Sequence, residues 1–507
     1  MRLPIGIQDF PTLRENNYVY VDKTQLMKSM CSTGQTVFLS RPRRFGKSLL
    51  LSTIESMYRG QKDLFKDLWL FSNHDFVEHP VIRLDFSNIN FTSTPLDVGI
   101  VDWLRIVGLQ YQFQIKSSNA RDAFRELILE LSQASKVVIL IDEYDKPITD
   151  YLLEPEKRDL HQAVLKSVYG LLKPLNAYLE FVILTGVSKI GKLSLFSDLN
   201  NLRDISLDPE FALLCGYTRQ EIAVHFQPEI EALRVAQNVS LEVLWSQITY
   251  WYNGYSWNGK ERLYCPFSFL VFLSQKEFRS FWFETGTPTF LVQLIRQGQL
   301  NPFSFEQCFT DAQAISSMDV SRIDPISLMF QTGYLTITQV QNSVLGTRYT
   351  LSYPNQEVRL AFSNSLLLEY SQKLPSQITS FALALQDALI ALDWESFFAV
   401  CNQVLSSVPY EIFPKREAYI HSLMHLMLIS TGFQTSSQVQ TSLGRMDTLV
   451  QTFTHSIIFE FKLGGSPQAA LEQIDRGRYK DSLVKPVVCL GVVFELEQKQ
   501  ITAWKAQ

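Results

Sequence analysis

VFLSRPRRFGKSLLLSTI, from Val37 to Ile54, is the stretch that decides the fold of the first part of this chain. A short apolar run leads into a basic turn that ends in Phe45-Gly46-Lys47-Ser48, and a second apolar run begins at Leu49. A buried run, a turn and a longer apolar run predict a strand, a loop and a helix in that order.

The turn has the composition of a phosphate-binding loop. The first backbone N–H groups of a helix lack an intrahelical partner and carry the positive end of the helix dipole, so a polyphosphate binds well there. Lys47 would reach the β- and γ-phosphates, and the Ser48 hydroxyl would ligate Mg²⁺. In the pattern G-x-x-x-x-G-K-[ST], Arg41 replaces the first glycine, which leaves the opening geometry of the loop undecided. The candidate nucleotide-binding residues of the turn are Arg43, Arg44, Phe45, Gly46, Lys47, Ser48 and Leu49.

A second stretch, VVILIDEYDKPI, supplies carboxylates for the same site. The apolar residues from Val137 to Ile141 predict a buried parallel strand, and Asp142 and Glu143 follow at its carboxyl end, where open α/β sheets bind ligands. Asp142 would hold the Mg²⁺ shell, and Glu143 would act as general base on the attacking water. Either motif alone could be a chance turn or a helix cap, but together they predict a nucleoside triphosphate site.

Thr185 follows a third apolar run, from Phe181 to Leu184. A polar side chain at the tip of a neighbouring strand can sense a γ-phosphate through a hydrogen bond. The alternative is that Thr185 and Ser188 only close a turn with Gly186, and the sequence does not choose between the two.

Composition limits the classes of protein that fit. A chain of 507 residues is long enough for two to four domains, and 46% hydrophobic with 19% charged residues is typical of folded protein. A net charge of -5 excludes a globally basic nucleic-acid binder. The six cysteines are scattered without a CxxC pair, which predicts free thiols and no zinc site. Without a signal-peptide pattern or a membrane-length apolar run, a cytoplasmic protein is expected.

The pattern along the chain changes twice. Residues 1–205 predict the sheet domain, with alternation from Tyr18 to Val21 read as an edge strand and a helix from Arg121 to Ala134 before the Asp142 strand. Residues 206–375 are rich in aromatic residues at helical spacing, which predicts a helical lid with an aromatic core and a small winged-helix-like module whose hairpin runs from Gly333 to Tyr349. Residues 376–507 read as helices, a hairpin, a helix and a buried strand.

The hairpin of the last part carries a second set of charged residues. Glu460 and Lys462 are two apart on a strand, so they project from one face, and a turn near Phe453 and Thr454 brings Asp447 opposite Glu460. Two carboxylates at that separation can hold Mg²⁺, and an adjacent ammonium can orient the attacking water. The alternative is a surface hairpin in which the glutamate and lysine simply pair.

This arrangement resembles the PD-(D/E)XK nuclease superfamily, with Gly444-Arg445-Met446-Asp447 and Glu460-Phe461-Lys462 as the matching residues. The resemblance implies that Glu417, on the preceding helix, is an additional acidic residue of the catalytic set. It also implies that Gln473, on the following helix, contacts substrate or supports the site, with Tyr479 as a further helper.

Across nearly its whole length the sequence resembles a bacterial family of AAA-ATPase-like proteins with a C-terminal PD-(D/E)XK nuclease domain. RPRRFGKS is the usual loop of that family. The other matching phrases are YVDKT, IDEYDKPI, TGVSKI, SDLNNLRDISLDPEFA, WYNGYSW, FETGTPTFL, QTGYLTI and YPNQEVR. The expected architecture is therefore α/β throughout: a P-loop NTPase parallel sheet, a helical and winged-helix-like middle region, and an α/β nuclease-like domain.

The combined expectation is an ATP-binding protein, an ATPase coupled to a Mg²⁺-dependent nuclease acting on DNA or RNA. The alternative is an ATP-dependent switch or scaffold whose nuclease-like domain only binds nucleic acid or a partner protein. Residues 411–507 hold ten Lys and Arg against nine Asp and Glu, which argues against strong non-specific DNA affinity through that part alone.

Overall fold

A computed structural model describes residues 2–32, 36–197, 199–282, 305–316, 323–344, 346–371, 373–407, 417–440, 445–477, 480 and 483–507. The chain divides into two compact units. Unit 1 comprises residues 1–282 and 308–355, and unit 2 comprises residues 283–307 and 356–507. The predicted boundaries at residues 205 and 375 stay predictions, because compactness does not show which segments fold alone.

Unit 1 contains the predicted parallel sheet. Its five strands have the order β2-β3-β4-β1-β5 and are parallel throughout. Their bounds are β1 Thr36–Ser40, β2 Val81–Asp85, β3 Val137–Asp142, β4 Leu179–Gly186 and β5 Leu202–Asp204. The central strands are buried on both faces, which explains why they read as continuous apolar runs rather than alternating ones.

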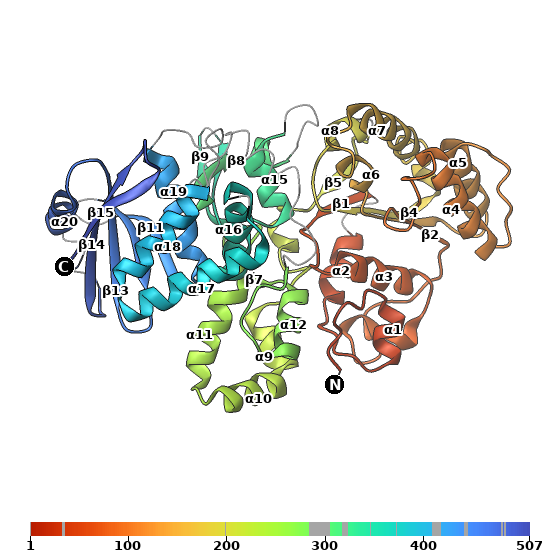
Figure 1. Ribbon diagram of the computed structural model, residues 1–507. Coiled ribbons are helices and arrows are strands. Elements are labelled where there is room, and N and C mark those ends of the chain that lie inside the picture. Colours follow the sequence, from red (N-terminus) through yellow and green to blue (C-terminus); the bar gives the residue numbers. More distant parts are fainter. Residues whose placement is uncertain are drawn as a thin grey trace. The chain divides into compact units, whose positions relative to one another are not determined.

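Helices cover both faces of this sheet (Figure 1), with α2 and α3 on one side and α6, α7 and α8 on the other. The connection from β2 to β3 holds two helices, α4 and α5, where the sequence predicted one. The bounds are α2 Thr24–Ser32, α3 Lys47–Tyr58, α4 Leu96–Gln110, α5 Ala120–Leu131, α6 Lys146–Thr149, α7 Pro155–Tyr169 and α8 Lys192–Leu195. Short 3₁₀ turns lie at Lys62–Phe65, Trp69–Ser72, Asn176–Tyr178 and Pro209–Phe211.

The N-terminal segment differs from its prediction. Residues 18–21 form no strand of the sheet; only Tyr18 makes an isolated bridge, to Arg2. Helix α1, Phe10–Glu15, precedes them. Their apolar and polar residues alternate because Val19 and Val21 pack into the core of the helical region. The same alternation is therefore produced by an extended segment that is buried on one side, without a strand at the edge of the sheet.

The helical region contains α9 Arg219–His225, α10 Gln227–Gln237, α11 Leu241–Tyr252 and α12 Pro266–Gln275, with the short strands β6 Asn253–Tyr255 and β7 Leu263–Tyr264. Its core is aromatic, as expected from the helical spacing: Trp245, Tyr252, Phe269, Phe272 and Phe281 are all buried in one cluster. Their rings therefore stabilise the fold rather than line a ligand cage.

The rest of unit 1 is a small three-stranded antiparallel sheet of order β8-β10-β9. Its elements are β8 Cys308–Asp311, α14 Ala312–Ser316, α15 Pro325–Thr332, β9 Thr336–Ser343 and β10 Gly346–Ser352. The expected hairpin is present, and it begins after Gly333, which ends α15 at a φ of +93°. A side chain at Gly333 would meet Pro42 of the phosphate loop at 2.8 Å, so this glycine lets the two segments approach closely.

Unit 2 has a five-stranded sheet of order β11-β12-β13-β14-β15, in which only β13 and β14 are parallel. Phe459 of β13 packs on Phe397 of α18, whereas Ile458 packs on Leu471 of α20, so helices cover opposite faces. The bounds are α16 Gln356–Ser371, α17 Pro375–Ala391, α18 Trp394–Ser407, α19 Glu417–Ser430, β11 Gln434–Gln440, β12 Arg445–Gln451, β13 Ser456–Leu463, α20 Pro467–Arg476, β14 Val487–Glu495 and β15 Gln500–Ala506.

All six cysteines are free thiols; five are buried and Cys31 is partly exposed. None of the described helices combines the length and the apolar character needed to cross a bilayer.

Candidate nucleotide and nuclease sites

The phosphate loop joins β1 to α3, as predicted. Gly46 precedes the helix at a φ of +91°, a conformation that suits glycine, and Arg44 has a φ of +69°. The Lys47 ammonium donates to the carbonyls of Arg41 and Pro42 at 2.9 and 3.0 Å. Burial lowers the pKa of Lys47, and the nearby carboxylates oppose that shift, foremost Asp142. Lys47 therefore lies within electrostatic reach of the acidic strand tip.

Arg41, at the position of the missing glycine, is a structural residue. It is fully buried, and its guanidinium donates to the carbonyls of Ser40, Ser206 and Phe211 at 2.9, 2.7 and 3.2 Å. Its guanidinium carbon lies 4.1 Å from the ring centre of Trp257. Burial lowers the pKa of Arg41 to about 10. The first residue of the loop is thus a buried cation whose hydrogen bonds connect the end of β1 to the chain after β5. This is the conformation of the start of the loop, which the sequence left undecided.

Arg41→Ala is expected to lower the free energy of unfolding by at least about 3 kcal/mol, because three carbonyls lose a charged donor inside the protein. Arg43→Ala, two residues away at an exposed position, is expected to change it by less than about 0.5 kcal/mol. Urea unfolding followed by circular dichroism measures both. Equal midpoints for the two variants would contradict a structural role for Arg41.

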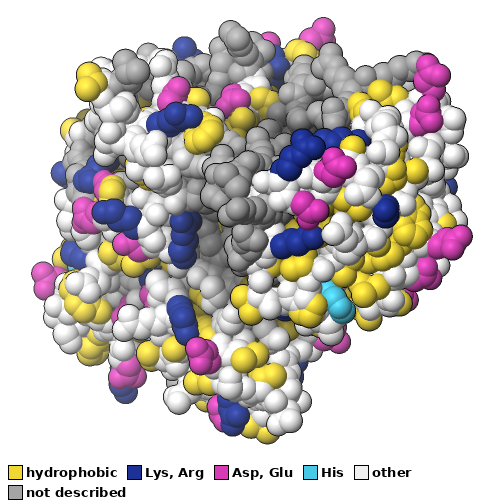
Figure 2. Space-filling model, turned by 90° about the vertical axis from the view of Figure 1, so that its left-hand side faces the viewer, with side chains coloured by type: hydrophobic (Ala, Val, Ile, Leu, Met, Phe, Trp, Pro, Cys, Tyr) yellow, Lys and Arg dark blue, Asp and Glu magenta, His cyan; other side chains and the backbone are white. Residues whose placement is uncertain are grey.

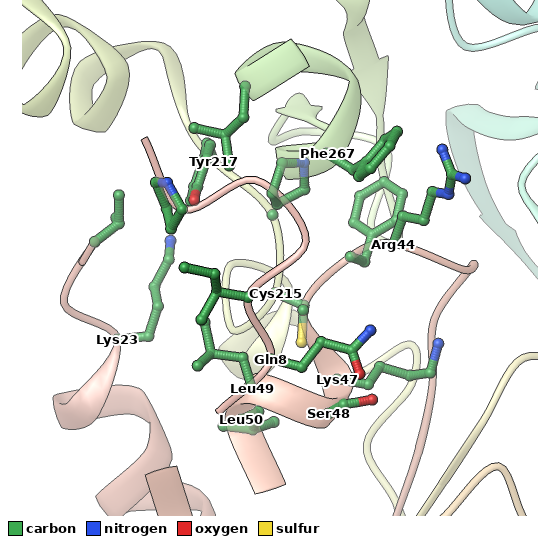
Figure 3. Close-up of a pocket in the computed structure, with 18 of the residues that line it drawn as sticks. Gln8, Lys23, Arg44, Lys47, Ser48, Leu49, Leu50, Cys215, Tyr217 and Phe267 are labelled. Carbon is green, nitrogen blue, oxygen red and sulfur yellow. The ribbon is translucent and has the colours of Figure 1, made fainter. Parts of the chain in front are cut away.

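The other loop side chains point in different directions. Phe45 is buried against Tyr255 and Trp257, with ring centres 4.7 and 5.3 Å apart, so its backbone rather than its ring is left for a nucleotide. Arg44 lies 3.7 Å over the Phe267 ring and donates to the Phe281 carbonyl at 3.1 Å. In Figure 3 its guanidinium is turned away from Lys47. Gly46 is exposed, and Ser48 and Leu49 are partly exposed at the helix start. Nucleotide contacts from this loop remain predictions.

Strand β4 lies between β1 and β3, so Thr185 is adjacent to both motifs. Thr185 is fully buried and donates to Asp142 Oδ1 at 2.7 Å. This hydrogen bond fixes the orientation of a carboxylate that is itself 1% exposed. The described contact makes Thr185 a support for Asp142, and a contact with a γ-phosphate stays a prediction.

Glu143 has a left-handed backbone with φ +51° and a partly exposed side chain that lines the cavity beside the loop. Burial raises the pKa of Glu143, and the carboxylates Asp142 and Asp145 add to the rise, while Lys47 opposes it. A carboxylate with a raised pKa is a better proton acceptor than an ordinary one, which suits a general base.

Asp145 is a buried acid that sequence reasoning missed. Its Oδ2 accepts hydrogen bonds from the backbone N–H and hydroxyl of Ser188 at 2.8 and 2.7 Å, which holds the turn after β4. The approach is so close that a Cβ on Gly186 would lie 2.6 Å from Asp145 Oδ1. A carboxylate two residues after the Asp142-Glu143 pair was the available signal.

A cavity of about 310 Å³ lies beside the loop (Figure 3). Besides the loop and the start of α3, its described walls come from five parts of unit 1: residues 4–8, residues 13–23, Glu143, residues 214–217 and the start of α12. Apolar side chains such as Ile7, Leu214 and Leu270 line it together with Lys47 and Ser48. A mostly apolar lining with a few polar groups is typical of small-molecule sites.

The second predicted constellation also comes together. The regular pairing of β12 and β13 stops at Thr448 and Phe459. Beyond it, Asp447 Oδ2 accepts from the backbone N–H of Phe461 at 3.0 Å, and the Asp447 N–H donates to Glu460 Oε2 at 3.4 Å. The two carboxylates therefore face each other where the strands separate.

Glu460 is fully buried, and its Oε1 lacks a hydrogen-bond partner in the described residues. Burial, together with the negative charge of Asp447, raises the pKa of Glu460 to about 8. The Lys462 ammonium lies 4.0 Å from Glu460 Oε1 and donates to Gln473 of α20. A buried oxygen without a partner beside a second carboxylate fits a divalent cation, because that ion would satisfy both.

Three further residues of this prediction cannot be placed as fully. Glu417 is the first residue of α19, but its side chain lies outside the described residues. Gly444 and Tyr479 also lie outside them. The contribution of Glu417 stays a prediction.

The two folds agree with comparisons to known proteins. Residues 4–196 match the family described as Predicted AAA-ATPase, and residues 415–504 match the PD-(D/E)XK nuclease superfamily. The chain belongs to the AAA-ATPase-like proteins that carry a PD-(D/E)XK nuclease superfamily domain at the C-terminal end. It is 36% identical over 519 residues to an uncharacterized protein in the vnfD 5′ region of Azotobacter chroococcum mcd 1, covering 99% of this chain and 98% of that relative. No solved structure matches the chain.

Proposed function

We propose that the protein is an ATPase whose nucleotide cycle is coupled to a Mg²⁺-dependent nuclease. The observation that carries the proposal is the presence of two separate acidic sites in one chain, each beside a lysine. DNA and RNA both remain candidate substrates of the second site.

In the first site, each residue has a role that its position supports. Lys47 would bind the β- and γ-phosphates after leaving the carbonyls of Arg41 and Pro42. Ser48 and Asp142 would hold Mg²⁺, with Asp142 oriented by its hydrogen bond from Thr185. Glu143 would accept the proton of the attacking water.

In the second site, Asp447 and Glu460 would hold the metal. Mg²⁺ bound there would polarise a phosphodiester and lower the pKa of a water molecule. Lys462 is positioned by Gln473, so its ammonium stays near the carboxylates and could bind a phosphate oxygen or orient the water. Glu417 would add a carboxylate from α19.

The nucleotide part is tested by thermal unfolding with ATP and Mg²⁺. Binding at a hundred times Kd stabilises a folded protein by about 2.7 kcal/mol, so the transition is expected to rise by several degrees. Lys47→Ala is expected to abolish the rise, whereas Lys66→Ala, at an exposed position on the same unit, is expected to keep it. No rise in the wild type would reject the nucleotide site.

The second candidate function is a switch or scaffold whose nuclease-like domain binds without cleaving. The near balance of basic and acidic residues in residues 411–507 favours a partner protein, rather than nucleic acid, as what that domain binds in this second function. On the face drawn in Figure 2, basic side chains of the described residues are interspersed with acidic and hydrophobic ones. Cleavage of DNA and RNA by the wild type and by Lys462→Ala discriminates, since equal residual activity in both would favour this second function.

A further inference from the structure

The Gln8 side chain reaches the cavity beside the two residues that define the phosphate loop. Figure 3 shows it extending from the N-terminal segment with its amide toward Lys47 and Ser48, and all three residues line the same cavity. Within the described part of the chain, the Gln8 amide makes no hydrogen bond. An amide has two N–H donors, so Gln8 has donors available for a ligand in the cavity.

The segment that carries Gln8 is attached to the helix that follows the phosphate loop. The backbone N–H of Phe10 donates to Ser52 Oγ of α3 at 2.9 Å. The Tyr20 hydroxyl lies 3.4 Å from Thr53 Oγ1 of the same helix. Because Phe10 is only two residues after Gln8, the contact with Ser52 holds the backbone that carries the exposed Gln8 side chain close to α3.

The cavity is also suited to an anion. Four basic residues line it, against a single acidic one, Glu143. Two of the basic groups already have partners, since Lys23 pairs with Glu221 and Arg44 donates to the Phe281 carbonyl. Among the described residues, the Lys47 ammonium donates only to neutral carbonyls, so an arriving phosphate would gain a cation without breaking an ion pair there.

We propose that Gln8 donates a hydrogen bond to the polyphosphate of a bound nucleotide, as a third contact beside Lys47 and Ser48. The inference rests on the nucleotide-binding function proposed above. A side-chain amide can donate to a phosphate oxygen without adding charge to a site that already holds Lys47.

The test uses two substitutions at Gln8 and the full-length protein. Gln8→Glu has nearly the same shape but replaces the donor with a negative charge, so the Kd for a fluorescent ATP analogue with Mg²⁺ is expected to rise about a hundredfold. Gln8→Ala loses one hydrogen bond to a charged group, and its Kd is expected to rise about tenfold. Gln110→Glu makes the same charge change at an exposed position on α4 and is expected to leave Kd unchanged.

The outcomes separate this inference from the function on which it rests. Binding of the analogue to Gln8→Glu within twofold of the wild type would overturn the phosphate contact while leaving the nucleotide site intact. Equal weakening by Gln8→Glu and Gln8→Ala would also overturn it, because a packing role does not distinguish the two. If the wild type binds no analogue, or if Lys47→Ala binds it as well as the wild type does, the proposed nucleotide-binding function is rejected. The inference about Gln8 is then rejected too, because it rests on that function.

Discussion

Glu143→Gln is expected to lower ATP hydrolysis about a hundredfold or more while leaving ATP binding nearly unchanged. The amide keeps the size of the side chain and its place at the edge of the cavity, but it cannot accept a proton from water. Lys47, which would hold the phosphates, and Ser48, which would hold Mg²⁺, are not altered by the change. Phosphate release gives the hydrolysis rate, and a fluorescent ATP analogue gives the affinity.

The matched control is Glu156→Gln, at an exposed position on α7, which is expected to hydrolyse ATP at the wild-type rate. The pH profile adds a second readout. Because the pKa of Glu143 is raised by burial, wild-type hydrolysis should begin to fall, as the pH is lowered, before an ordinary carboxyl group would protonate. Wild-type hydrolysis by Glu143→Gln would rule out its role as general base.

The parts of these sites that lie at strand tips were predictable from the sequence. Apolar runs ending in Asp142 and Thr185 predict parallel strands, and parallel strands present their carboxyl ends at one edge of a sheet. The spacing of Asp447, Glu460 and Lys462 around one turn similarly predicts that they meet. In both sites the prediction needs only short stretches of sequence, because the alternation of side chains along a strand and the position of a short turn determine which side chains face each other.

Contacts between distant segments were not predictable in the same way. Arg41 replaces the first glycine of the loop pattern, and the sequence left the geometry there undecided, because the carbonyl partners of Arg41 at Ser206 and Phe211 are more than 160 residues away in sequence. The hydrogen bond from Phe10 to Ser52, which holds the segment carrying Gln8 against α3, is likewise not signalled by any periodicity. Alternation at residues 18–21 was misread because packing on one side of any extended segment gives the same pattern.

Asp447→Asn is expected to remove metal binding at the second site and, without metal, to stabilise the protein at high pH. The pKa of Glu460 is raised to about 8 by burial and by Asp447. A buried acid with a raised pKa keeps its proton in the folded state after the unfolded chain has lost it. Wild-type stability from this group is therefore full below about pH 4.5 and falls as the pH rises toward about 8. Removing the Asp447 charge should make this loss of stability with rising pH smaller.

Thermal unfolding of metal-free protein at pH 6 and pH 9 measures this effect. Relative to the wild type, the Asp447→Asn transition is expected to be unchanged at pH 6 and higher by about 2 °C at pH 9. Mn²⁺ should stabilise the wild type at pH 9 and leave Asp447→Asn unaffected. Any cleavage of nucleic acid should fall more than about a hundredfold, since loss of groups that merely support a metal ligand already costs 10–100-fold.

Asp475→Asn is the matched control, because Asp475 is exposed on α20 and pairs only with Lys480 among the described contacts. It should respond to Mn²⁺ and to pH as the wild type does. If Asp447→Asn were still stabilised by Mn²⁺ to the wild-type extent, the two carboxylates would not form a metal site. Their close approach, with Glu460 Oε1 buried and without a hydrogen-bond partner among the described residues, would then be a cost to stability that no metal ion relieves.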